Sequence, residues 1–314
     1  MTTSYIPQSF PVFDGSGMCA LDERVLWELV AQWREYREGI PVELRGDLGR
    51  RAPERTSSVS RASDVAVIPI HDVITKRASF WSDMMGGTSL DALSVQLAAA
   101  RADDSVRAVL LDVDSPGGGV YGTDEVAEQI AELDAQKPVV AFVSGLAASA
   151  AYWLASSASR IVASPSADLG SIGVYALHFD TSGALREAGI VPTLIKAGEF
   201  KGEGNPYFPL TDDDRDAMSA RIQTHYARFV ARVARGRKLP VDVVRKDFGR
   251  GRVLDAKTAA DVGMATDLGG YHDAIRIAQK EARERSSQQT QSAVARPRSD
   301  AFLSLQLQLE EVAR

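Results

Sequence analysis

A serine, Ser149, lies in a run of small residues whose types suit nucleophilic catalysis. The run spans residues 144–153 (SGLAASAAYW), follows an apolar stretch at 138–143 and leads into a helix that we expect from residue 148. Small neighbours let a substrate backbone come close, and the first N–H groups of a helix lack partners within it. An acyl-transfer site needs such a nucleophile beside N–H groups that stabilise an oxyanion. A serine that merely packs within a small-residue helix is the alternative interpretation.

Two side chains compete for the role of base beside this serine. His178 lies downstream of it and is soon followed by Asp180, which would give a Ser-His-Asp arrangement. Lys201 is the rival, because it follows a strand expected at 190–195 and a glycine and would reach the end of that strand. A lysine acts as a base in its neutral form, which burial or nearby cations favour. The residue types alone leave both alternatives open.

Two further segments rich in glycine follow expected strands. Residues 114–119 (DSPGGG) come after a strand expected at 106–113, and residues 168–173 (DLGSIG) come after one at 160–163. Because sites in parallel α/β sheets form at the carboxyl ends of strands, we expect these turns and the Ser149 segment to converge on one crevice. A phosphate cradle at 117–119 is a weaker interpretation, since the patterns GxxxxGK[ST] and GxGxxG are both absent.

The surrounding chain predicts alternating strands and helices. We expect strands at 64–70, 106–113, 138–143, 160–163, near 172–178 and at 190–195, and helices at 89–101, 122–134, from 148, at 182–188 and at 211–236. Alternation at these lengths predicts an α/β fold with a mainly parallel sheet covered by helices. Thr211, followed by three aspartates, is a typical helix start.

The two ends of the chain differ in composition from its centre. Residues 1–62 predict an N-terminal helical extension, with an amphipathic helix at 21–38, and a linker rich in Arg, Pro, Ser and Gly. Residues 63–280 form the expected folded domain. Residues 281–314 predict a polar, flexible tail, in which 301–312 suits either a short partner-binding helix or a frayed end.

Composition excludes several classes of protein. The chain has 314 residues and a net charge of −6, which argues against bulk nucleic-acid binding. Its single cysteine excludes an intrachain disulfide, and its four histidines form no zinc pattern, so we expect no metal and no cofactor. The uncharged residues 138–159 are long enough to span a membrane, but a β-type run followed by many alanines and serines favours a strand and a helix. With no signal-peptide pattern at the start, we expect a cytoplasmic protein.

Four motifs, in order, resemble one known family. They are residues 114–121 (DSPGGGVY), 147–153 (AASAAYW), 170–174 (GSIGV) and 197–201 (AGEFK). Together they resemble the signal peptide peptidase A family of Ser-Lys serine proteases, and the resemblance spans residues 64–280. It implies a fold of the Clp protease/crotonase type, with a repeated β-β-α core.

The resemblance also implies a role for particular residues. Ser149 would be the nucleophile, Lys201 the general base, and Ser171 the residue that hydrogen-bonds the lysine amine. The N–H groups of Gly118 and Ala150, with Gly117 beside them, would form the oxyanion hole. Activity should fall below neutral pH, because a protonated lysine cannot accept a proton. The family usually has two glycines after the serine, where this chain has Ala150 and Ala151.

Residues 69–77, 80–81 and 86–89 resemble one branch of the family, the prohead proteases of tailed phages. That branch implies protein substrates such as scaffold, portal or capsid proteins, a homo-oligomer, and a location in the host cytoplasm or procapsid. A cytosolic peptidase with a housekeeping role is the near alternative. A crotonase-type acyl-CoA enzyme and a non-catalytic head component are alternatives of other classes.

Overall fold

One large, mostly parallel sheet forms the centre of the fold. A computed structural model describes residues 18–21, 60–78 and 87–295. The strands are β1 (Met18–Leu21), β2 (Ser60–Ala62), β3 (Val65–Thr75), β4 (Thr88–Ser89), β5 (Ala108–Gly119), β6 (Val139–Ala148), β7 (Arg160–Ala163), β8 (Asp168–Gly170), β9 (Tyr175–Ala176), β10 (Val253–Asp255) and β11 (Asp267–Leu268). The main path runs β10-β8-β6-β5-β1-β9. β3, β5, β6, β7 and β8 pair in parallel, and β1 and β10 join antiparallel.

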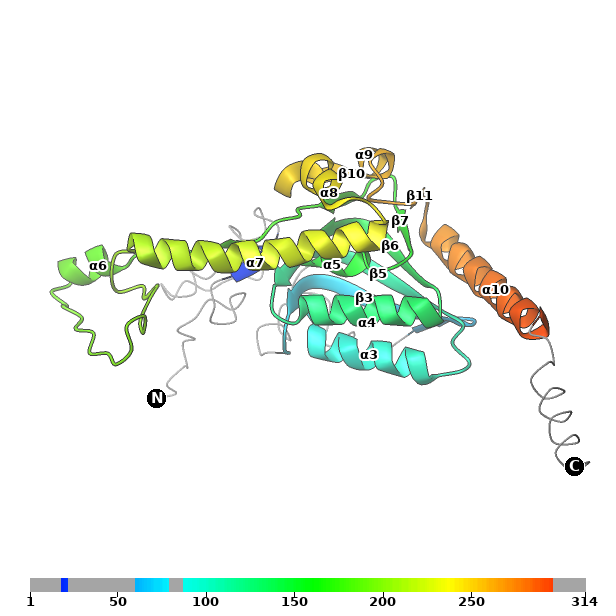
Figure 1. Cartoon of the computed structure of the whole chain (residues 1–314), viewed down its shortest axis with the longest axis horizontal. Coiled ribbons are helices and arrows are strands. Elements are labelled where there is room, and N and C mark those ends of the chain that lie inside the picture. The colour runs from blue at the N-terminus through cyan, green and yellow to red at the C-terminus, as the bar shows by residue number, and fades with distance from the viewer. Residues whose placement is uncertain (1–17, 22–59, 79–86, 296–314) are drawn as a thin grey trace, which may run out of the picture.

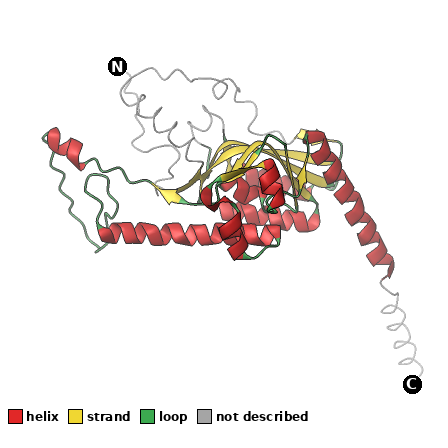
Figure 2. Ribbon diagram, turned by 90° about the horizontal axis from the view of Figure 1, so that it is seen from above, coloured by secondary structure: helices red, strands yellow, loops and turns green. Residues whose placement is uncertain are grey.

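Helices cover both faces of this sheet (Figures 1 and 2). They are α3 (Leu90–Ala102), α4 (Thr123–Gln136), α5 (Ala150–Ala155), α6 (Ser182–Glu187), α7 (Asp212–Arg237), α8 (Val241–Asp247), the 3-10 turn η2 (Gly249–Gly251), α9 (Ala256–Asp261) and α10 (Tyr271–Ala295). Buried side chains of α3, α4, α5 and α7 share one core with the sheet, and those of α10 pack on its other face. The α/β fold class expected from the sequence is confirmed.

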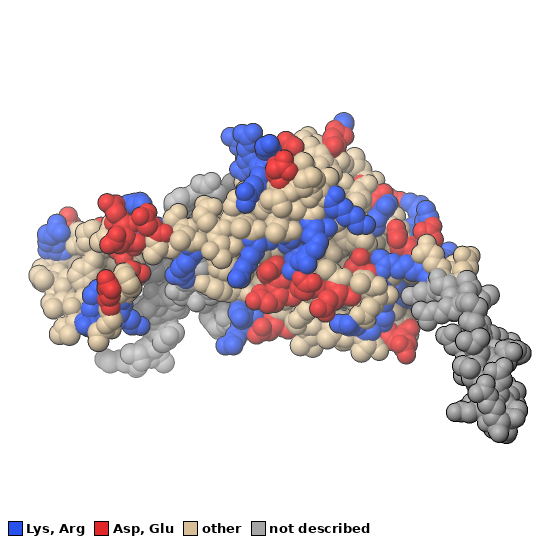
Figure 3. All heavy atoms as spheres, in the orientation of Figure 1, with Lys and Arg blue, Asp and Glu red and all other residues tan. Residues whose placement is uncertain are grey.

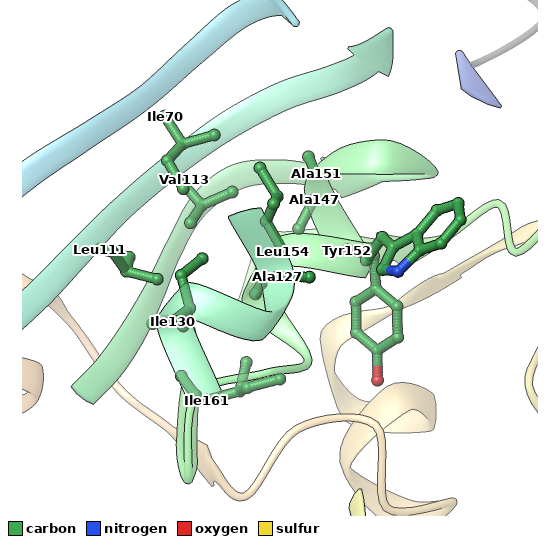
Figure 4. Close-up of a cluster of buried hydrophobic side chains, with 14 of the residues drawn as sticks. Ile70, Leu111, Val113, Ala127, Ile130, Ala147, Ala151, Tyr152, Leu154 and Ile161 are labelled. Carbon is green, nitrogen blue, oxygen red and sulfur yellow. The ribbon is translucent and has the colours of Figure 1, made fainter. Parts of the chain in front are cut away.

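Alternating side chains in the central strands supply the two cores. On β5, Val109 and Leu111 face the core under α3, α4 and α5, whereas Ala108 and Leu110 face α10. Figure 4 shows Leu111 close to Ile130 of α4 in the first core. This period of two is what a strand buried on both faces requires, because successive side chains point to opposite sides.

Three segments expected to be turns are wholly or partly strand instead, and in the third Asp168–Gly170 form β8. β5 continues through the glycines to Gly119, and β6 continues through the Ser-Gly pair to Ala148. The physical reason is that both extensions gain new ladder partners: β1 pairs with Gly117–Gly119, and β8 pairs with 146–148. Residues 138–159 are thus a strand and a helix, as expected, although no turn falls at 144–145.

Two other expectations on element boundaries are wrong. Residues 190–195 form an irregular, mostly exposed segment in place of a strand. α10 runs unbroken past residue 280, so 281–295 are helical where a flexible tail was expected. The expected helix at 21–38, most of the linker and the stretch at 301–312 lie outside the described residues. The division into three regions stays a prediction.

The longest helix, α7, links the core to an outlying part of the chain. Its 26 residues span about 39 Å at 1.5 Å per residue. It begins as expected at Thr211, whose side chain forms a capping box with Asp214. Near its other end Arg232 pairs with Asp124 and Glu128 of α4. Figure 3 shows basic side chains along α7 beside acidic ones over α4. Ion pairs within the chain therefore hold this end of α7 against α4.

Candidate active site

Ser149 lies at the junction of β6 and α5, in an unusual backbone conformation. Its φ is 54° and its ψ is −118°, a region that non-glycine residues rarely adopt. The Ser149 N–H donates to the carbonyl oxygen of Gly170 at 2.7 Å, which holds this strained junction against β8. The Ser149 hydroxyl lies 3.5 Å from the carbonyl oxygen of Gly173, at the limit of a hydrogen bond. The hydroxyl is therefore weakly held, while its backbone is firmly fixed.

Ser171 lies beside Ser149 because β8 pairs in parallel with the last three residues of β6, 146–148. Ala148 is opposite Gly170 in this ladder, so the two serines follow the ends of adjacent strands. Ser171 also has a positive φ, 53°, and its N–H donates to the carbonyl oxygen of Arg252 at 2.9 Å. Strained residues of this kind are enriched in functional sites. The structure brings these two candidate residues together.

The glycines at the end of β5 differ in what their N–H groups can do. The N–H of Gly117 donates to the Ser115 hydroxyl at 3.2 Å, and that hydroxyl donates to the carbonyl oxygen of Asp72 at 2.5 Å. Gly117 thus has a structural partner already. At Gly118 a Cβ would stand 1.8 Å from the carbonyl oxygen of Ile74, so only glycine fits against β3. Gly118 lies in the last residues of β5 and Ser149 directly follows β6, the neighbouring strand, since Ser115 is paired with Ala147.

Buried packing against α7 holds α5, the helix that starts at Ser149. All six residues of α5, Ala150 among them, are fully buried. Trp153 stacks on Phe229 of α7, with ring centroids 4.5 Å apart and planes 3° apart. The Tyr152 hydroxyl donates to the carbonyl oxygen of Met264 at 3.0 Å, and burial raises the pKa of Tyr152. A Cβ at Gly236 would meet the carbonyl oxygen of Ser156 at 1.8 Å.

Arg237 also holds α5 to α7, because it donates to the carbonyl oxygens of Ser156 and Ala158 just beyond α5. We call Phe229, Gly236 and Arg237 the anchor residues. Burial lowers the pKa of this guanidinium. None of the anchor residues Phe229, Gly236 and Arg237 was singled out from the sequence. The sequence gives little indication of their role, because the contacts of an aromatic residue or a glycine inside a helix depend on partners that lie far away in the sequence.

Lys201 lies in an outlying segment that we call the arm, residues 177–211, between β9 and α7. Figures 1 and 2 show α6 and the rest of the arm beyond the N-terminal end of α7, far from α5 and the sheet. Lys201 is exposed, and its N–H donates to the carbonyl oxygen of Gly198 at 3.2 Å. Within one chain, the structure does not bring Lys201 to Ser149.

His178, the other candidate base, also belongs to the arm. Its Nε2 lies 3.5 Å from the carbonyl oxygen of Asn205. Hydrogen bonds from Ser182 hold the pKa of Asp180 below its ordinary value. These contacts join arm residues to one another. Within residues 18–21, 60–78 and 87–295, no three His, Cys, Asp or Glu side chains gather closely enough to bind a metal ion.

Fold and site together define a class. A serine held in a strained conformation between a strand end and a helix, beside a glycine-rich strand end, is typical of α/β hydrolytic enzymes with a serine nucleophile. The model of peptidase family S49 matches residues 131–285, and that of the Clp protease family matches residues 63–168. The match to peptidase family S49 confirms the resemblance of the chain to the signal peptide peptidase A family.

Individual relatives include two phage proteins. The head-tail preconnector protein GP5 of Enterobacteria phage P21 is 34% identical over 272 residues, 87% of this chain and 49% of that protein. The capsid assembly protease C of Escherichia phage lambda is 33% identical over 225 residues, 72% of this chain and 51% of that protein. A putative signal peptide peptidase SppA of Enterococcus faecium is 30% identical over 187 residues, 59% of this chain and 54% of that protein.

The chain spans about half the length of these curated relatives. Among solved structures, a ClpP1 mutant from Listeria monocytogenes is 16% identical with a TM-score of 0.43, covering 66% of this chain and 93% of that one. In the part of the chain that the structure describes, no helix combines the length and apolar character needed to cross a bilayer.

Proposed function

We propose that this chain is a serine endopeptidase whose nucleophile is Ser149. The observation that carries the proposal is the strained, buried serine at the end of β6, adjacent to the end of β5 where Gly118 lies. Strain of this kind persists where the surrounding structure enforces it and a function needs it. The match of residues 131–285 to peptidase family S49 supports the same chemistry.

The proposed reaction is acyl transfer in two steps. The Ser149 oxygen attacks the peptide carbonyl carbon while Lys201, neutral, accepts the hydroxyl proton. The proton then passes to the leaving amine, the C–N bond breaks, and an acyl ester remains on Ser149. Water attacks the ester in the second step, with Lys201 again as base. The N–H groups of Gly118 and Ala150 would stabilise each oxyanion, a contribution of about 2.7–4 kcal/mol per donor.

Lys201 must move close to Ser149 for this reaction, and we propose that a second copy of the chain supplies it. The arm that carries Lys201 exposes apolar side chains that are otherwise rare on this surface: Ile195 is 93% exposed, Val191 84% and Phe200 64%. Exposed apolar clusters mark association surfaces. A homo-oligomer in which the arm of one copy lies against the site of the next would bury these residues and complete the dyad.

For the substrate, we propose proteins of a phage head, such as scaffold, portal or capsid proteins, cleaved in the host cytoplasm or the procapsid. The support comes from the two phage relatives, one named a capsid assembly protease and the other a head-tail preconnector protein. Extended, uncharged segments would suit the glycine-lined end of β5.

The experiment compares the wild type with Ser149→Ala and Lys201→Ala. Matched controls are Ser166→Ala, at an exposed serine, and Lys196→Ala, at the other lysine of the arm. Each protein is incubated with casein and, separately, with a fluorophosphonate, and is then analysed by intact-mass spectrometry. We expect loss of cleavage by roughly 10³-fold or more in the two site variants, full cleavage by both controls, and a phosphonyl adduct on Ser149.

Other outcomes would point elsewhere. Full cleavage by Ser149→Ala would overturn the assignment of the nucleophile. An acyl-CoA enzyme would cleave casein in no variant, the wild type included. Failure of Ser149 to take up the probe, with no cleavage by the wild type, would favour a non-catalytic head component.

Mixing the two inactive variants tests where Lys201 acts. Ser149→Ala retains its lysine and Lys201→Ala retains its serine, so a site shared between copies regains part of the wild-type activity in a 1:1 mixture. A mixture that stays inactive after subunit exchange means that the arm folds back onto its own chain. Ile195→Asp should weaken self-association in sedimentation, whereas Val95→Asp, at a residue on α3 that is 69% exposed, should not.

A further inference from the structure

A short strand from the chain's own N-terminal part is paired on both sides near Ser149. β1, residues 18–21, lies between β5 and β9 and is antiparallel to both. Cys19 is opposite Gly119 on one side and Tyr175 on the other. β1 is thus held as an interior strand at this end of the sheet, although it has four residues.

The position of β1 is set by where β6 leaves β5. β6 pairs with β5 as far as Ser115 and Ala147, two residues before Ser149. From Gly117 onwards β3 still occupies one edge of β5, while β1 occupies the other, the edge that β6 has left. The N-terminal strand therefore lies along the glycine end of β5, next to the strand end that carries the nucleophile.

An endopeptidase must hold its substrate in this kind of arrangement. Extended peptides bind many proteins by adding a strand to an open sheet edge, where main-chain hydrogen bonds give affinity whatever the sequence. Two antiparallel neighbours give such a peptide two ladders. β9 begins two residues after Gly173, whose carbonyl oxygen lies 3.5 Å from the Ser149 hydroxyl oxygen. β1 therefore lies between β5 and β9, and both of these strands end or begin close to Ser149.

We propose that residues 18–21 occupy the peptide-binding cleft as an internal pseudosubstrate, which an incoming peptide must displace. This inference rests on the proposed function. Ser149 is 1% exposed, so access to its hydroxyl requires some element to move. The strand Met-Cys-Ala-Leu carries no charge, and the facing residues Gly117–Gly119 have no side chains. The cleft accordingly takes extended, uncharged segments with small residues.

The decisive variant is Ala20→Pro in the full chain, with Ala20→Val as its matched control. A proline removes one ladder N–H and is disfavoured inside a strand, whereas valine keeps the N–H and favours a strand. If β1 fills the cleft nine-tenths of the time, releasing it raises the rate of casein cleavage about tenfold. We expect that rise in Ala20→Pro and a rate at or below that of the wild type in Ala20→Val.

Two readouts in the Ser149→Ala background do not depend on catalysis. Hydrogen exchange at the amides of 117–119 and 175–176 should be faster with Ala20→Pro than with Ala20→Val. Cys19, the only cysteine of the chain, should react faster with N-ethylmaleimide. These readouts test the strand even if no variant cleaves any substrate, so failure of the proposed function is distinguishable from failure of this inference.

A separate synthetic peptide tests whether the sequence of β1 itself binds the cleft. A synthetic peptide with the sequence of residues 14–25 should inhibit casein cleavage by Ala20→Pro, and a scrambled peptide should not. Self-cleavage within residues 18–21 in the wild type would also support occupancy of the cleft. Equal cleavage rates and equal hydrogen exchange in Ala20→Pro and Ala20→Val would overturn the proposal.

Discussion

The two ends of α7 lie in contrasting surroundings, although they belong to one helix. Near its C-terminal end Phe229, Val230 and Val233 are fully buried, and this end packs against α5, the helix that follows Ser149. Its N-terminal end carries the arm, in which Val191 and Ile195 are almost fully exposed. Figure 1 shows the first end against the sheet and the other well beyond it.

The contrast shows that the two candidate catalytic residues are positioned by different means. Ser149 is fixed by packing within the chain, because its helix is buried on every side. Lys201 belongs to a segment whose largest apolar groups face solvent, so its position depends on what those groups contact. The proposed site would thus have a preorganised half, which carries Ser149, and a half that carries Lys201 and that association completes. It follows that variants in the two regions should differ in kind: buried changes should lower stability, and arm changes should alter assembly.

The largest difference in stability should come from replacing a phenylalanine in each region. Phe229→Ala removes a buried ring stacked on Trp153, which should lower the free energy of unfolding by about 3–5 kcal/mol. Phe200→Ala, in the arm, removes a ring that is 64% exposed and should change it by less than about 0.5 kcal/mol. Urea unfolding of the full chain measures both. Equal losses would mean that the arm is packed as firmly as the core.

A second, smaller difference should come from replacing a glycine in each region. Gly118→Ala places a methyl group 1.8 Å from a backbone carbonyl oxygen that cannot turn away, so β3 or β5 must shift. We expect a loss of about 1–3 kcal/mol and at least 100-fold slower casein cleavage, since the proposed oxyanion donor is displaced. Gly183→Ala, in α6, meets nothing within 4 Å and should be neutral or stabilising by up to about 1 kcal/mol. Unimpaired cleavage by Gly118→Ala would exclude this N–H from the site.

The sequence predicts that Ser149, Ser171 and Gly118 lie near one another, and there is a physical reason for this. Buried parallel strands have a strong apolar signature. Glycine is also required at 117 and 170, where φ is positive, and at 118, where a Cβ would collide with the backbone. The pairing of β6 with β5 and β8 then brings Ser149, Ser171 and Gly118 to neighbouring strand ends. Their chemical roles stay predictions, because position alone does not show reactivity.

The arm and β1 could not be predicted in the same way. Residues 190–195 are mostly apolar, as in a strand, yet they pair with no described strand. An apolar run does not reveal whether the surface that covers it belongs to the same chain. β1 is four residues long in a stretch with no periodicity. Its strand conformation comes from the two edges that receive it, which lie about 100 and 155 residues away along the sequence.

The two ends of α7 can also be compared by the pH dependence of stability, because each end has a carboxylate with a lowered pKa, Glu128 beside one end and Asp214 at the other. Hydrogen bonds and charge from Arg232, which is 5% exposed, hold the pKa of Glu128 below its ordinary value. Hydrogen bonds from Thr211 do the same for the pKa of Asp214 at the start of α7. A lowered carboxyl pKa adds stability above the unfolded value, about 4, and that stability is lost as the pH falls through the folded value. Both carboxylates should therefore stabilise the protein at pH 7 and lose this effect below pH 4.

The two losses should nevertheless differ in extent. Protonation of Glu128 loosens α4 from the buried end of α7, so Glu128→Gln should lower the melting temperature at pH 7 and flatten its fall between pH 5 and pH 3. Asp214→Asn should leave the melting temperature nearly unchanged, because fraying is confined to the first turn and to the arm that it carries. Hydrogen exchange in residues 204–216 should then rise in Asp214→Asn alone. A global loss of stability in Asp214→Asn would show that the arm belongs to the same cooperative unit as the core, and the contrast between the two ends of α7 would fail.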